Sequence, residues 1–134
     1  MANDAAYALT RETALSYEEA DRRVREALKE EGFGVLTEID VKDTLKKKLD
    51  VDFQKYEILG ACNPPLAHQA LQTEADIGLL LPCNVVVREL PDGRTMVEAL
   101  DPVTQLGVAG NEALGPVAED VRQRMQRVLD SLAD

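Results

Sequence analysis

The chain has 134 residues, and its 25 acidic and 15 basic side chains give a formal charge of −10. Hydrophobic residues make up 45% and charged residues 30%, which is typical of one globular domain spanning residues 1–134. This acidic balance argues against a nucleic-acid partner, because such proteins carry clustered positive charge. Only 4% of the residues are aromatic and none is Trp, which disfavours a site built on aromatic stacking.

The first residues carry an acid and no basic cluster before an apolar run, so we expect no signal peptide. The longest apolar stretch, residues 77–87, is far shorter than the roughly 20 residues that span a bilayer. Cys62 and Cys83, without a secretion signal, are typical of reduced thiols. We therefore predict a cytoplasmic protein with no membrane partner.

The first half of the chain alternates strands and helices. Residues 7–14 partly alternate between apolar and polar side chains, which predicts a strand. Ser16 and Glu19 form a capping box that begins a helix, and Gly32 ends it. A second strand is expected over residues 33–39. A short helix follows, with Val41, Leu45 and Leu49 on one stripe.

The second half begins with a strand over residues 56–61, and Asn63 then caps a helix whose first residue is Pro64. A long strand over residues 79–89 contains Pro82, which indicates a bulge or the true strand start. A hairpin turn at residues 91–94, a return strand at 95–100, a loop at 101–110 and a helix at 113–132 complete the chain. The order βαβαβαββα predicts a two-layer α+β domain, with helices on one face of a mixed or antiparallel sheet of about five strands.

Two Cys-Asn pairs, each beside a proline, are the most informative feature: Cys62-Asn63 and Cys83-Asn84. Cys62 precedes a helix N-terminus, where the free N–H groups and the helix dipole favour a thiolate. The alternative is that both cysteines are small buried hydrophobes and both asparagines cap or turn the chain. The chain geometry permits contact between the two cysteines without requiring it.

The sequence gives little support for other kinds of catalytic or metal site. His68, the one histidine, is a possible accessory to the cysteines but is expected on an exposed helix face. A zinc site lacks ligands, since it needs four. Lys46, Lys47 and Lys48 are expected on a solvated helix face. No carboxylate lies in the apolar surroundings that mark a general acid.

Residues 58–64, Ala67, Ala70 and Leu71, followed by residues 78–87, resemble the domain of unknown function 302 family of prokaryotes. The resemblance covers nearly the whole chain, and the paired Cys-Asn-Pro and Pro-Cys-Asn segments are its most specific part. It implies a compact α+β domain and self-association. It implies no established activity.

We predict a homodimeric binding module, without catalysis, that holds a small molecule or a metal near Cys62, Asn63, Cys83 and Asn84. One alternative is a thiol redox or transfer protein with Cys62 as nucleophile and Cys83 as resolving partner. The other is a structural self-association domain. The sequence indicates no identity for a cofactor or for the metal.

Overall fold

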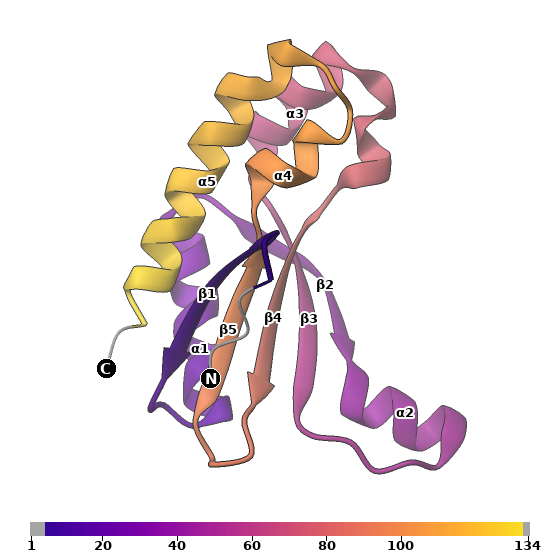
Figure 1. Cartoon of the computed structure of the whole chain (residues 1–134), viewed down its shortest axis with the longest axis vertical. Helices are drawn as coiled ribbons and strands as arrows, with labels where there is room; N and C mark the ends of the chain where they lie inside the picture. The colour runs from indigo at the N-terminus through magenta and orange to yellow at the C-terminus, as the bar shows by residue number, and fades with distance from the viewer. Residues whose placement is uncertain (1–4, 133–134) are drawn as a thin grey trace.

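The computed structural model describes residues 5–132, which form a five-stranded sheet in the order β1-β5-β4-β3-β2 (Figure 1). Every neighbouring pair is antiparallel, so the sheet has no parallel component. β1 and β2 are its two edges. The strands are β1 (Ala8–Thr13), β2 (Gly34–Asp40), β3 (Tyr56–Cys62), β4 (Cys83–Glu89) and β5 (Thr95–Leu100).

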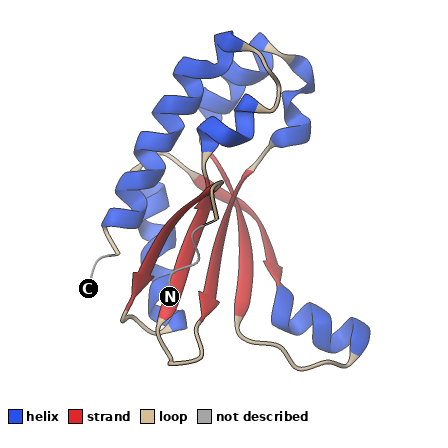
Figure 2. Cartoon of the chain, in the orientation of Figure 1, coloured by secondary structure: helices blue, strands red, loops and turns tan. Residues whose placement is uncertain are grey.

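The long helices α1 and α5 pack against each other and against the strands, whereas α3 and α4 lie beyond one end of the sheet and pack on α5 (Figures 1 and 2). This arrangement confirms the predicted two-layer α+β class. None of the helices within residues 5–132 is long and apolar enough to cross a membrane. The helices are α1 (Tyr17–Glu30), α2 (Val41–Leu49), α3 (Pro64–Thr73), α4 (Pro102–Gly107) and α5 (Gly115–Asp130), with 3₁₀ helices η1 (Ala75–Leu80) and η2 (Glu112–Leu114).

The core lies between the sheet and the α1–α5 pair. Side chains of α1 at a spacing of four residues, Ala20, Val24 and Leu28, are fully buried there. The predicted caps of this helix are confirmed, because the Ser16 side chain accepts a hydrogen bond from the Glu19 N–H at 3.1 Å. At its other end Gly32 takes φ +85°, a conformation that favours glycine.

The region between β3 and α5 differs from the sequence prediction. The strand expected over residues 79–89 begins only at Cys83, because residues 75–80 form η1. The loop expected over residues 101–110 contains α4. Asp101 caps this helix by accepting a hydrogen bond from the Val103 N–H at 3.0 Å, and Pro102 occupies its first turn. A capping aspartate followed by proline was interpreted as a turn because six residues are too few to show helical periodicity.

The segment from β2 through α2 projects from the body of the domain (Figure 1). The stripe at Val41, Leu45 and Leu49 was expected to pack inward, yet α2 has no buried residue. Lys46, Lys47 and Lys48 lie in its exposed last turn, as predicted, and Lys47 pairs with Asp43 at 2.9 Å. We call residues 34–53 the arm.

Candidate functional site

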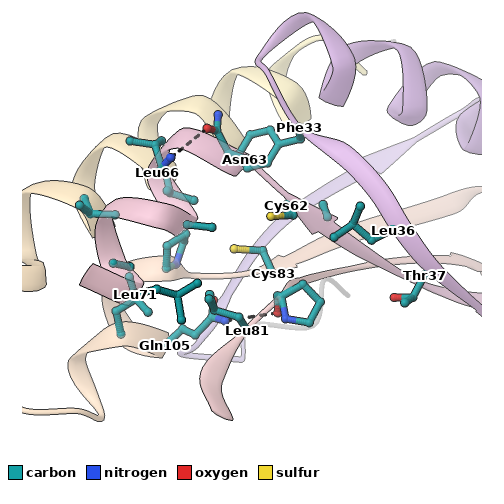
Figure 3. A pocket seen from close by; sticks show the side chains of 18 residues that line it. Phe33, Leu36, Thr37, Cys62, Asn63, Leu66, Leu71, Leu81, Cys83 and Gln105 are labelled. Carbon is teal, nitrogen blue, oxygen red and sulfur yellow. Dashed lines mark hydrogen bonds between the residues drawn. The ribbon is translucent and has the colours of Figure 1, made fainter. Parts of the chain in front are cut away.

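A pocket of about 310 Å³ lies at the end of the sheet where β3 and β4 meet the helices α3, α4 and α5 (Figure 3). None of the described residues that line it is charged. Its walls are aliphatic and aromatic carbon with five polar side chains among them. The lining consists of Phe33, Leu36, Thr37, Ala61, Cys62, Asn63, Leu66, Ala67, Ala70, Leu71, Leu81, Pro82, Cys83, Pro102, Gln105, Leu106, Val117 and Val121.

Both cysteines line this pocket, and their sulfur atoms point toward the same side of it (Figure 3). The strand register places both residues at the same end of the sheet, since Ala61 pairs with Cys83 and Cys62 is the next residue of β3. Strict alternation would turn Cys62 to the other face, but Cys62 is the last residue of the strand and lines the pocket. Both thiols are free, with Cys83 buried and Cys62 half-buried. The antiparallel pairing of β3 with β4 therefore brings together two thiols that are distant in the sequence.

Burial raises the pKa of the Cys62 thiol above its ordinary value. Burial, reinforced by the neighbouring Cys62, raises the pKa of Cys83 to about 11. The direction for Cys62 is opposite to the one expected from its place before a helix N-terminus, and its cause is the desolvation of the sulfur. At neutral pH both groups are S–H, which are weak donors and poor nucleophiles.

Asn63 caps α3 as predicted, and its amide is committed to the backbone. The side-chain Oδ1 accepts a hydrogen bond from the Leu66 N–H at 3.3 Å. Nδ2 donates to the Glu31 carbonyl at 3.3 Å and thereby ties the end of α1 to the start of α3. Asn63 lines the pocket, but its main role is to fix the backbone that carries Cys62.

The other two predicted residues do not reach the pocket. Asn84 alternates with the buried Cys83 and Val85 along β4, so its exposed side chain lies on the opposite face of the sheet. His68 lies on the exposed side of α3, beside the half-buried Ala67. The structure therefore brings together Cys62, Asn63 and Cys83, and separates Asn84 and His68 from them.

A close backbone approach shapes one wall of the pocket. A Cβ atom at Gly60 would lie 2.1 Å from Thr37 Oγ1 and 2.9 Å from Pro82 Cγ. Only glycine allows Thr37 and Pro82 to cover β3 at this point. The Leu81–Pro82 peptide bond is cis.

Nothing in the sequence analysis singled out Gln105, which lies on α4 and lines the pocket. This side chain is only 5% exposed. Its Nε2 donates to the carbonyls of Leu80 and Pro82, the latter at 3.4 Å. Its Oε1 is buried and has no hydrogen-bond partner within the described chain. Residues 101–110 were expected to form a loop, so nothing indicated that a glutamine there would be buried.

A polar cluster that includes the buried Glu57 lies where α1 faces β2 and β3, away from the pocket. Arg25 contacts three carboxylates: Asp21 at 2.8 Å, Glu38 at 2.5 Å and Glu57 at 3.2 Å. Burial first, and then the adjacent Asp21, raise the pKa of Glu57 to about 8. The expectation that no carboxylate has the surroundings of a weak acid is therefore wrong for Glu57. A strand pattern over residues 56–61 does not tell which side chains face the helices.

Within residues 5–132 no group of three or more His, Cys, Asp or Glu side chains is placed to hold a metal ion. The two pocket thiols are the only soft donors that the described structure brings together there. They would be two ligands at most, too few for a zinc site.

Comparison with known proteins agrees with this geometry. A family model described as "Domain of unknown function DUF302" matches residues 9–132. The chain belongs to the DUF302 family. The crystal structure of an uncharacterised conserved DUF302 protein from Bacillus stearothermophilus is similar, with 32% sequence identity and a TM-score of 0.89. The match covers 96% of this chain and 99% of the other, so the DUF302 fold accounts for the whole domain. No curated protein matches the chain.

Proposed function

We propose that this DUF302 domain is a binding module whose pocket holds a small, uncharged and mainly apolar molecule. The observation that supports this function is a cavity of about 310 Å³ lined by uncharged side chains. Such cavities are the usual form of a small-molecule site. Because the pKa values of both pocket thiols are raised, the pocket offers no stable charge at neutral pH. An ionised ligand would lose its hydration without gaining a counter-ion.

Titration with N-phenyl-1-naphthylamine, a neutral fluorescent aromatic amine, tests this function. We expect saturable fluorescence enhancement with the wild-type chain. Ala67→Trp would fill the pocket from α3, because Ala67 is half-buried and lines it. His68→Trp is the matched control, since this neighbour on the same helix is exposed and does not line the pocket.

We expect Ala67→Trp to weaken probe binding at least tenfold and His68→Trp to leave it unchanged. Circular dichroism and a thermal melt would verify that both variants fold. Equal binding by folded Ala67→Trp and wild type would contradict the proposal, as would the absence of any saturable binding to wild type.

We propose further that the domain forms a homodimer through the arm. Half of the large exposed hydrophobic side chains of the described chain lie on it, including Leu36 at 67% and Leu49 at 65% exposure. Exposed apolar side chains that gather on one segment are typical of protein–protein contact surfaces. The five on the arm are Leu36, Ile39, Leu49, Val51 and Phe53.

The charges of α2 favour a second copy as the occupant of this surface. Asp43 lies in the first turn of the helix, and Lys46, Lys47 and Lys48 lie in the last turn. Two α2 helices packed antiparallel about a two-fold axis would place the acidic end of each beside the basic end of the other. The helix dipoles would also oppose each other favourably.

Sedimentation velocity at about 100 μM tests the homodimer, which would have twice the monomer mass of 14.7 kDa. We expect Leu49→Asp to give the monomer and Leu79→Asp to remain dimeric. Leu79 is a matched control because it is also a highly exposed leucine, but on η1, away from the arm. A monomeric wild type, or a dimeric Leu49→Asp variant, would contradict the proposal.

We place the domain in the cytoplasm, where reducing conditions keep both cysteines as thiols. This location and the absence of nucleic-acid and membrane partners stay predictions from the sequence.

A further inference from the structure

Gln105 is a buried amide with half of its hydrogen-bonding capacity unused. Its Nε2 is held by the carbonyls of Leu80 and Pro82, both in the segment that leads from η1 into β4. These two bonds fix the orientation of the amide, because a flipped side chain would set its oxygen against two carbonyl oxygens. Oε1 is therefore the atom left without a partner.

An unpartnered buried acceptor destabilises a fold, because it loses its hydration without gaining a hydrogen bond. Native proteins keep few such groups, and each calls for a specific explanation. Gln105 lines the pocket together with the two protonated thiols, so a molecule bound in the pocket can supply the missing partner (Figure 3). Thr37, on the edge strand β2, also lines it. Apart from Gln105 Oε1, no side-chain atom of the lining is a buried acceptor without a partner.

We propose that the molecule bound in the pocket carries one hydrogen-bond donor, an N–H or O–H group on an otherwise apolar frame, and that Gln105 Oε1 accepts from it. This inference rests on the proposed function and narrows its ligand class. An apolar molecule without a donor would leave the buried Oε1 without a partner. An anion would face the Oε1 lone pairs and would be rejected.

A matched pair of probes, indole and indene, tests the assignment. The two bicyclic molecules have nearly the same shape, and only indole carries an N–H. Affinities would be measured by NMR titration of the full chain, for the wild type and for Gln105→Leu. Taking the indole-to-indene ratio within each protein cancels the different hydration of the two probes.

We expect this affinity ratio to be roughly fivefold to tenfold higher in the wild type than in Gln105→Leu, the range of a neutral hydrogen bond worth about 1–1.4 kcal/mol. Gln123→Leu is the control, since Gln123 is an exposed glutamine of α5 that does not line the pocket, and it should keep the wild-type ratio. Equal ratios in wild type and Gln105→Leu would overturn the assignment while leaving the pocket function intact. Failure of both probes to bind wild type would overturn both.

Gln105→Leu also removes two donors to backbone carbonyls, so the variant can lose stability. A measurement on the wild type alone therefore accompanies it. The ¹³Cδ resonance of Gln105 should move downfield with indole, because its carbonyl then accepts a hydrogen bond, and should stay in place with indene. The same shift with both probes would overturn the assignment.

Discussion

Replacing Glu57 by glutamine tests how a buried carboxyl controls the stability of the domain. Glu57 is 8% exposed, and burial together with Asp21 raises its pKa from the ordinary value of 4.5 to about 8. Between these two pH values the unfolded chain has lost this proton and the folded chain keeps it. Folding therefore takes up a proton, and stability falls as pH rises through this window.

The magnitude follows from the two pKa values. Each pH unit between 4.5 and about 8 lowers the free energy of unfolding by about 1.4 kcal/mol through this group. The loss is below about 1 kcal/mol at pH 5 and roughly 3 kcal/mol at pH 7. Glutamine has nearly the same shape, stays neutral, and can donate to Asp21 and accept from Arg25. Glu57→Gln should therefore be more stable than wild type by roughly 3 kcal/mol at pH 7 and nearly equal to it at pH 5.

Urea denaturation at half-unit steps from pH 5 to pH 8 would measure both proteins. Glu26→Gln is the control, since Glu26 lies on α1, the helix that carries Asp21 and Arg25, and pairs with Arg22 at 2.6 Å but is exposed. This variant should follow the pH dependence of the wild type. Parallel curves for wild type and Glu57→Gln would refute the reasoning, because the two proteins would then take up the same number of protons on folding.

Four other outcomes follow from the site. Asn63→Ala removes a helix cap and the bond to the Glu31 carbonyl, so we expect it to lower the free energy of unfolding in urea by about 2 kcal/mol. Asn84→Ala, on the exposed face, should change it by less than about 0.5 kcal/mol. Iodoacetamide should alkylate Cys62 slowly at pH 7 and faster as pH rises above 9, and Cys83 more slowly still, because both thiol pKa values are raised. Mass spectrometry would follow the two sites, and fast alkylation of Cys62 at pH 7 would contradict the raised pKa and favour a redox function. Gly60→Ala should lower the free energy of unfolding by about 1–3 kcal/mol in the same urea assay, since its Cβ would lie 2.1 Å from the Thr37 hydroxyl oxygen. A variant as stable as wild type would show that the Thr37 side chain moves aside without cost.

Local signals in the sequence identify most elements of this fold correctly. The caps at Ser16 and Asn63 act over three residues, so the residues themselves predict where α1 and α3 begin. The same kind of signal at Asp101 was interpreted as part of a loop. Helix caps and turns use the same residue types, and only a longer apolar stripe after the cap would have identified the helix. The strand expected over residues 79–89 was too long, since apolar side chains in η1 resemble a strand, but the alternative that Pro82 marks the true strand start agrees with β4 beginning at Cys83.

The site could be predicted only in part. The Cys-Asn pairs indicated the right region, and strand pairing places Cys62 and Cys83 in one pocket. Asn84 was grouped with them by sequence likeness, although period-two alternation puts adjacent strand residues on opposite faces. The contribution of Gln105 depends on the packing of α4 against η1 and α5, which is long-range and leaves no local pattern.

The pocket lies between two parts of the domain, and a bound molecule would couple their motions. It lies at the seam between the sheet and the group formed by α3, α4 and the first turns of α5 (Figure 1). A molecule seated there would touch both parts at once, through Ala61 and Cys83 on one side and Leu66 and Leu106 on the other. Occupancy and the freedom of α3 to move would then be thermodynamically linked. Slower hydrogen exchange in α3 would indicate that the pocket is occupied. By reciprocity, any protein that binds the outer side of α3 would change the affinity of the pocket for its ligand.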